Sequence, residues 1–380
     1  MKFKSLIIIV IFFFQTYLGL SQISNFKEKF GLPSEVKETS GLLFLNGKII
    51  THNDSGDDAN LYEIDSLSGN LLRTVTINNA TNVDWEDITE DEYHIYIGDI
   101  GNNNGTRTDL KIYKILKTDY LNNNSVSAET ISFSYEDQTD FSSSNSHNFD
   151  AEAIVFYGDS FFVFTKNRGD FKTNVYKIPS TIGTHSALKV STANVEGLIT
   201  GATTSNDNFY LCGYDSTLIP FLIYISFNRA PGDDLFSSGF VKESLENSIG
   251  QGSQVEAITS YELGKYYISR ELFSTTISGF PFSFPQKLYE FSDQRDFLLS
   301  TDQNNFATFK ITPNPTYDKI SIKTGSTIQK VSIFNILGEK VMGIHTNKKE
   351  IDISSFSKGI YLVKILTDNH KSYHRKIIKL

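Results

Sequence analysis

The sequence predicts an all-β protein: a β-propeller of five blades, or six, followed by a small immunoglobulin-like β-sandwich. One reason is composition, since the 380 residues include 30 Phe and 19 Tyr but only 8 Pro and 2 Met. Chains rich in aromatic and β-branched residues favour pleated strands joined by polar turns. The other reason is repetition, because three short patterns recur in one order five times between residues 38 and 291. Units of this length without a helical period are typical of propeller blades.

The chain begins with the layout of a secretory signal. Lys2 and Lys4 precede an unbroken apolar run, Leu6–Phe14, and the small residues Gly19 and Ser21 follow. This pattern predicts cleavage after Ser21, so residues 1–21 are expected to be a signal peptide. Nine apolar residues are too few for a permanent membrane helix, and no later stretch is apolar enough to span. We therefore expect an exported mature protein without a transmembrane segment.

The repeat consists of three columns. A glutamate motif comes first, a strand-like apolar run second and a tyrosine strand third. The glutamates of successive copies are 44 to 66 residues apart. Loops of different length therefore join similar units, and a sixth, degenerate unit could lie in residues 116–150. The first column is a glutamate followed by a small and an apolar residue, at Glu38, Glu86, Glu152, Glu196 and Glu256. The third is a strand with a tyrosine, at Tyr62, Tyr113, Tyr176, Tyr224 and Tyr289.

A fourth strand is available in most copies, for example "LLRTVTI" and "ETISFSY". The last copy lacks one after "LYEF". The segment "NFKEKFGL", which precedes the first copy, could supply it and close the ring, so that no sheet edge stays exposed.

The propeller geometry predicts where polar residues converge. In an antiparallel blade the second strand ends near the start of the first, so the five glutamates share one mouth with the residues that end the second strands. Lys166, Asn167, Asn102 and Glu271 belong to the same region. The candidate ligand-binding mouth comprises Glu38, Asn53, Asp54, Glu86, Asp99, Glu152, Arg168, Glu196, Asp215, Glu256 and Arg270.

Two interpretations of this mouth compete. Its oxygens could bind a hard cation such as Ca²⁺, with Glu86, Asp99 and Glu152 as candidate metal ligands. Alternatively each glutamate accepts backbone hydrogen bonds or pairs with Lys166 or a neighbouring arginine, because perturbed carboxylates also occur in structural networks. A residue present in every blade usually serves the blade, which favours the second interpretation. The two can coexist if only some glutamates face the channel.

Several other chemistries lack support in the sequence. The loops "HNDSGDD" and "GDIGNNNG" match neither the twelve-residue calcium loop nor a phosphate loop, and their composition suits ordinary turns. The histidines of the body offer no pair at zinc-ligand spacing, and no Gly-x-Ser-x-Gly elbow occurs. Trp85 is expected to be a buried packing residue, and Cys212 a small buried apolar one. The acidic body disfavours nucleic acid as a partner.

The last 75 residues differ from the rest in charge. Residues 306–380 carry 13 Lys or Arg and 5 Asp or Glu, whereas the whole chain has a formal charge of −9. This contrast predicts a domain boundary near residue 305. After the turn Pro313-Asn314-Pro315 come the short alternating segments "KISIK", "QKVSIFNI", "KEIDIS", "GIYLVKI" and "HRKIIKL", which favour a small antiparallel sandwich.

This segment resembles the type A sorting domain of the type IX secretion system. The resemblance rests on the Pro-Asn-Pro start, "VSIFNILGEKV", "IDISSFSKGIYLVKI" and the basic "KIIKL" end. It implies export by the signal peptide, then transfer across the outer membrane by the type IX machinery. The tail is then removed and the cargo is attached to the cell surface or released. The expected domains are therefore the signal, residues 1–21, the propeller, residues 22–305, and the sorting domain, residues 306–380.

The body resembles the SdiA-regulated and phytase-like or esterase-like extracytoplasmic propellers. The shared features are strand starts of the form E-x-x-G/A-L/I and the tyrosine strand, over residues 30–292, and they imply the fold only. We expect a binding module for a cation, a glycan or a protein. An alternative is a metal-assisted hydrolase of phosphate esters or lactones, with Lys166, Arg168 and Arg270 holding an anionic substrate. A structural or adhesive protein is the third hypothesis.

Overall fold

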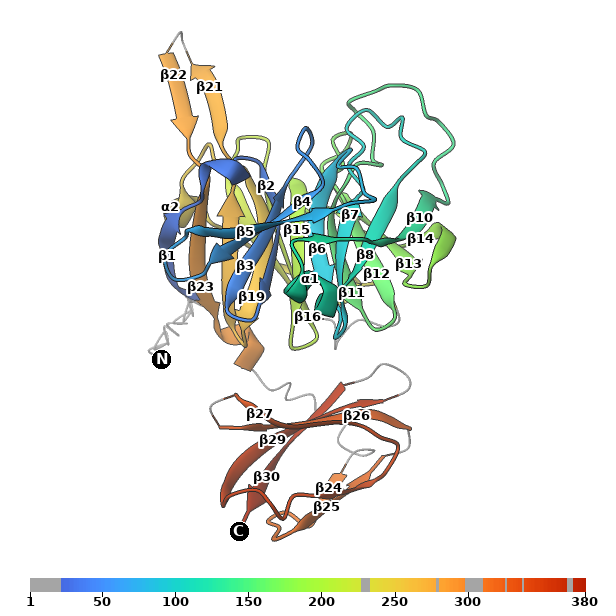
Figure 1. Ribbon diagram of the computed structural model, residues 1–380, viewed down its shortest axis with the longest axis vertical. Coiled ribbons are helices and arrows are strands. Elements are labelled where there is room, and N and C mark those ends of the chain that lie inside the picture. Colours follow the sequence, from blue (N-terminus) through green and yellow to red (C-terminus); the bar gives the residue numbers. More distant parts are fainter. Residues whose placement is uncertain are drawn as a thin grey trace, which may run out of the picture.

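The protein consists of a β-propeller and a smaller β-sandwich, seen one above the other in Figure 1. The computed structural model describes residues 22–226, 233–277, 280–297, 310–324, 327–336, 338–367 and 372–380. The predicted signal peptide and the predicted boundary near residue 305 lie outside these residues. Within them, none of the helices has the length and apolar character needed to cross a membrane.

Five blades surround one axis, each a four-stranded antiparallel sheet named here from the axis outward. The first holds β2 (Thr39–Leu45), β3 (Lys48–Asn53), β4 (Asn60–Asp65) and β5 (Leu71–Ile77), with β9 (Ser125–Val126) beside β5. The second holds β6 (Trp85–Glu90), β7 (His94–Asp99), β8 (Lys111–Leu116) and β10 (Glu129–Tyr135). The third holds β11 (Ala151–Tyr157), β12 (Ser160–Thr165), β13 (Thr173–Pro179) and β14 (Gly183–Ala193).

The remaining two blades complete the ring. The fourth holds β15 (Leu198–Ser205), β16 (Asn208–Tyr214), β17 (Pro220–Ser226) and β18 (Val241–Ser244). The fifth holds β19 (Val255–Glu262), β20 (Lys265–Arg270), β23 (Lys287–Asp293) and β1 (Ile23–Gly31). A two-stranded ribbon, β21 (Phe273–Ile277) and β22 (Phe280–Phe284), projects from the fifth blade. The helical elements are short: α1 (Lys117–Asn122), α2 (Glu246–Ile249) and the 3-10 turns Ser34–Val36 and Gln294–Phe297.

The ring closes through the first strand of the chain. The innermost strands β2, β6, β11, β15 and β19 contact one another in order, and β19 returns to β2. Strand β1 pairs with β23 as the outer strand of the fifth blade, and Phe26 stacks on Phe291 at 5.4 Å between ring centroids. The predictions of five blades and of closure by "NFKEKFGL" are therefore confirmed. Residues 116–150 hold α1, β9 and β10 rather than a sixth blade.

The repeat columns are confirmed for tyrosine and corrected for glutamate. The five tyrosines lie in the third strands, as predicted. The glutamate column is wrong in the first and fourth blades, where Glu38 and Glu196 precede the innermost strand. Each innermost strand instead carries one bulged residue near its start. These structurally equivalent residues are Ser40, Glu86, Glu152, Thr200 and Glu256.

The only tryptophan and the only cysteine of the sequence, Trp85 and Cys212, both lie between blades. Trp85 is fully buried in the cluster that joins the first and second blades. Cys212 is buried between the fourth and fifth blades, where burial raises its pKa well above that of a free thiol. Both are packing residues, as predicted.

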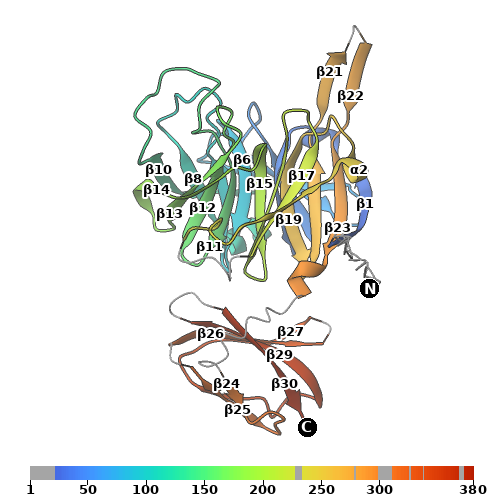
Figure 2. The same cartoon turned by 180° about the vertical axis from the view of Figure 1, so that it is seen from behind.

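The sorting region folds as a sandwich of two antiparallel sheets. It meets the propeller through ion pairs, among them Lys330 with the exposed Glu92 at 3.1 Å and Lys364 with the buried Asp207 at 3.4 Å. Both propeller residues lie in turns between first and second strands, opposite the β21–β22 ribbon (Figures 1 and 2). One sheet holds β24 (Lys310–Thr312), β25 (Lys319–Lys323) and β28 (Glu350–Asp352). The other holds β27 (Lys340–His345), β26 (Ile328–Asn335), β29 (Gly359–Thr367) and β30 (Ser372–Lys379).

A buried carboxylate joins the last two blades. Asp296, in the 3-10 turn after β23, is 2% exposed. It accepts hydrogen bonds from Ser205 Oγ at 2.6 Å, Tyr210 Oη at 2.9 Å and the Gly264 N–H at 3.0 Å. These donors belong to both blades, so one side chain ties the end of the propeller to its neighbour.

Replacing Asp296 by Ala should lower the free energy of unfolding by about 3 kcal/mol, because several buried donors would lose their acceptor. Chemical denaturation of the full chain measures this. Asp233→Ala is the control, since the exposed pair of Asp233 with Lys177 contributes less than about 1 kcal/mol. Equal destabilisation by the two substitutions would contradict the assignment.

Candidate functional site

Carboxylates from four blades gather at one end of the channel, on the face away from the sorting domain. We call this set the acidic mouth. Its members come from the end of β3, the start of β6, the start of β11, and the β19 and β20 strands of the fifth blade. They are Asp54, Asp84, Glu86, Asp150, Glu152, Glu256 and Glu271.

One half of the acidic mouth is neutralised by cations. Lys166 is 6% exposed, and its Nζ lies 2.9 Å from Glu152 Oε2. Arg168 Nη2 lies 3.0 Å from Asp150 Oδ2 and 3.6 Å from Glu152 Oε1. Burial raises the pKa of Glu152 to about 7, although Lys166 opposes the shift. In this half the carboxylates pair with Lys166 and Arg168, as the second interpretation of the mouth predicts.

The other half has no such partners. Asp54, Asp84 and Glu86 each place a carboxylate oxygen within 4.8 Å of the others. Glu86 is 2% exposed, and its Oε1 has no hydrogen-bond partner in the described part of the chain; the same holds for Oδ1 of Asp54. Burial and the neighbouring negative charges raise the pKa of Glu86 well above its ordinary value and that of Asp54 to about 8. Three acids thus converge, and two of them, Asp54 and Glu86, each have a carboxylate oxygen without a partner in the described residues.

A glycine leaves space for this convergence. The loop after β7 brings the Gly101 backbone against the carboxylates, and the N–H of Gly101 donates to the Asp84 carbonyl at 3.1 Å. A Cβ at residue 101 would lie 2.5 Å from Asp84 Cγ and still closer to Glu86 Oε1. A side chain at this residue would therefore displace the two acids.

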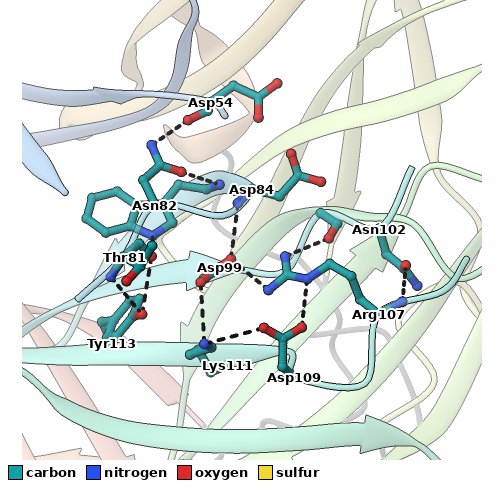
Figure 3. Close-up of polar contacts among 12 residues, drawn as sticks. Asp54, Thr81, Asn82, Asp84, Asp99, Asn102, Arg107, Asp109, Lys111 and Tyr113 are labelled. Atoms are coloured by element: carbon teal, nitrogen blue, oxygen red, sulfur yellow. Dashed lines mark hydrogen bonds and ion pairs between the residues drawn. The ribbon is translucent and has the colours of Figure 1, made fainter. Parts of the chain in front are cut away.

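Asp99, predicted as a metal ligand, has a different role. It is fully buried and pairs with Arg107 Nη2 at 2.9 Å (Figure 3). Its Oδ1 also accepts the N–H of Asp84 at 3.2 Å. Asp99 thus holds the backbone of Asp84 in place, and of the three predicted metal ligands only Glu86 lacks a cationic partner.

Other predicted mouth residues serve local structure. Glu38 and Glu196 are exposed, and Glu38 acts on the acidic mouth only electrostatically, through Glu271. Asp215 closes its own turn, accepting the N–H of Thr217 at 2.8 Å. The remaining two are likewise occupied: Asn53 donates to the Glu35 carbonyl at 2.8 Å, and Arg270 donates to the Pro285 carbonyl and to Ser253 Oγ, both at 3.0 Å.

Asp87, whose side chain bridges blades across the axis, was not identified from the sequence. Asp87 is fully buried, and its Oδ2 accepts the N–H groups of Ile154 at 3.0 Å and Ala202 at 3.3 Å, across the axis. The carboxylate therefore ties the second blade to the third and fourth across the axis. A signal was present, because the residue after each bulge is small in every other blade: Gly41, Ala153, Gly201 and Ala257.

Comparison with known proteins identifies the smaller domain. Residues 310–379 match the family model described as "Secretion system C-terminal sorting domain". The tail is a type IX sorting domain. It indicates that the protein is secreted or displayed on the cell surface after handling by the type IX machinery. The predicted sorting domain and localisation are confirmed.

Two curated relatives share a short region with the chain. The ulvan lyase NLR42 of Nonlabens ulvanivorans is 34% identical over 84 residues, which are 21% of this chain and 16% of that protein. The endo-acting ulvan lyase of Formosa agariphila is 32% identical over 87 residues, or 21% and 17%. The chain thus spans less than a fifth of the length of either enzyme.

Solved structures resemble the chain only distantly. An exo-β-1,3-galactanase from Phanerochaete chrysosporium is 7% identical, with a TM-score of 0.45, over 93% of this chain and 94% of that one. PorZ of the Porphyromonas gingivalis type IX secretion system is 12% identical, with a TM-score of 0.35, over 90% and 45%. At such values the likeness says nothing about activity. The resemblance to SdiA-regulated and phytase-like propellers stays a prediction.

The raised pKa values predict how stability depends on pH. Because Glu152 and Glu271 have pKa values of about 7 and Asp54 of about 8, the folded protein holds these protons more tightly than the unfolded chain. Their stabilisation is complete below the unfolded pKa, near 4, and is lost as pH rises to about 8.

The melting temperature of the metal-free chain should therefore fall by several degrees between about pH 6.5 and pH 8, above the range in which the buried His52, with its pKa lowered to about 4, opposes the trend. Asp54→Asn should flatten this slope. Carboxyls with lowered pKa, such as Glu63, titrate below the window and do not mask the effect. A melting temperature that rises with pH in this range would show that the carboxyl groups of the acidic mouth do not have raised pKa values.

Proposed function

We propose that the chain is an exported binding module that takes a divalent cation of the Ca²⁺ type at its acidic mouth. Asp54, Asp84 and Glu86 would hold the ion. The observation that carries the proposal is the buried Oε1 of Glu86, which has no partner in the described chain and lies beside two further carboxylates. Burying several negative charges together is unfavourable unless a positive charge compensates them.

The donor set suits a hard cation. All three side chains offer carboxylate oxygens, the ligands that Ca²⁺ prefers, and backbone carbonyls and waters commonly complete its shell of six to eight oxygens. Zinc and copper favour imidazole and thiolate ligands, and the cluster holds neither. Asp54 and Asp84 come from the loops after β3 and before β6, which are rich in Asn, Asp and Gly, and Glu86 lies near the start of β6. Such loops can adjust to the irregular geometry of Ca²⁺.

The geometry favours binding over hydrolysis. Of the three cations expected to hold an anionic substrate, Lys166 is buried on Glu152 and Arg270 is engaged with Pro285 and Ser253. Only Arg168 has its guanidinium partly exposed. A metal-assisted hydrolase of phosphate esters or lactones, and a purely adhesive protein, stay the alternatives. The names of the two ulvan lyases make a glycan a reasonable ligand to test.

Ca²⁺ should raise the melting temperature of the chelator-treated full chain. A ligand that binds only the folded state stabilises it by about 2.7 kcal/mol at one hundred times its Kd. Glu86→Gln and Asp84→Asn should abolish most of the shift. Glu196→Gln is the matched control, because Glu196 is exposed outside the acidic mouth and should leave the shift unchanged. No shift at millimolar Ca²⁺, or an undiminished shift in Glu86→Gln, would refute the proposal.

A further inference from the structure

We infer that the cation forms part of a site for a carboxylate-bearing ligand, with Arg168 as the second anchor. This inference rests on the proposed cation site. It concerns the coordination positions of the ion that face solvent. Four features support it: the orientation of Arg168, its link to Asp84, the partial exposure of Asp54 and the charge of the acidic mouth.

Arg168 is held in one orientation with part of its guanidinium unused. Its Nε and Nη2 donate to Asp150 Oδ2 at 3.2 and 3.0 Å, and Nη2 also donates to Asn103 Oδ1 at 2.6 Å. In the described part of the chain, Nη1 donates no hydrogen bond, and the side chain is 29% exposed. A planar guanidinium fixed on one edge is prepared to bind a planar carboxylate on another.

One side chain links this arginine to the proposed cation site. Asn103 accepts the bond from Arg168 and donates through Nδ2 to Asp84 Oδ2 at 3.3 Å. Asp150, the partner of Arg168, also acts electrostatically on Asp84 and Glu86. The exposed guanidinium and the acids that would hold the ion therefore belong to one connected group.

The acidic mouth is partly accessible to solvent. Asp54, one of the proposed ligands, is half-buried, and so is Arg168. With one oxygen from each residue, the three carboxylates fill three of the six to eight positions around Ca²⁺, so positions otherwise held by water stay open for an incoming ligand. A carboxylate could supply oxygen to the ion and pair with Arg168 at the same time.

The charge of the acidic mouth makes the order of binding testable. Its carboxylates outnumber its cations, so a free anion is repelled until Ca²⁺ is bound. Binding of the anion and of the ion should therefore be coupled, and each should raise the affinity of the other by the same factor. A neutral sugar finds less to hold it, because Trp85 and Tyr214 are buried and offer no stacking surface.

The test is calorimetric titration of the full chain with D-glucuronate, with and without millimolar Ca²⁺. D-glucose is the uncharged control. We expect glucuronate to bind only with Ca²⁺ and glucose not to bind. Arg168→Gln and Arg168→Lys should keep the Ca²⁺-induced rise in melting temperature but weaken glucuronate about tenfold or more, which is about 1.4 kcal/mol. Lys172→Gln, on the same loop with an exposed side chain, should change neither.

The outcomes separate the two proposals. If Ca²⁺ stabilises the protein but glucuronate does not bind, the ligand inference fails and the cation site stands. If glucuronate binds equally without Ca²⁺, or equally to both Arg168 variants, the inference is also overturned. If Ca²⁺ has no effect on the unmodified chain, both proposals fail.

Discussion

Crowding at the axis governs this molecule. Five innermost strands converge on one line, and a Cβ added at Gly41 or Gly201 would lie within 3 Å of the backbone of the next blade. Side chains at that level must be very small, or must replace the lost contacts, as Asp87 does by accepting two backbone N–H groups from other blades. The bulge just before this position turns the neighbouring side chain out of the axis, in line with the general role of bulges in re-aiming residues. The acidic mouth is a consequence of this turn.

The bulged column shows how one position can serve the fold in some blades and a ligand in others. In the first blade Ser40 Oγ donates to the Glu86 carbonyl at 2.7 Å, and in the fourth Thr200 Oγ1 donates to the Val255 carbonyl at 2.6 Å. These short side chains join one innermost strand to the next. Glutamate is too long for that bond and extends into the mouth. Glu152 meets Lys166 there, whereas Glu86 meets other acids and a long contact from Ser40 Oγ at 3.4 Å.

Much of the fold follows from local pattern, because strand alternation and the tyrosine column are short-range signals. The blade count and the closing strand follow for the same reason. The prediction of the glutamate column was wrong at Glu38 and Glu196 because it matched one residue type. The feature that recurs in every blade is a backbone bulge, and in two blades the bulged residue is Ser40 or Thr200. The site was harder to predict. The sequence alone does not show whether Asp99 or Asp84 forms the ion pair with Arg107. The fold of the loop after β7 decides it by placing Arg107 against Asp99.

The sorting domain and the acidic mouth lie on opposite faces of the propeller. The tail meets the propeller through ion pairs on the face opposite the acidic mouth, and the partly exposed pair of Lys330 with Glu92 contributes about 0–1 kcal/mol. The propeller closes its ring with β1 and secures its last turn with Asp296, so it depends on the tail for neither. The ring closure by β1 and the contacts of Asp296 would therefore persist without the sorting domain.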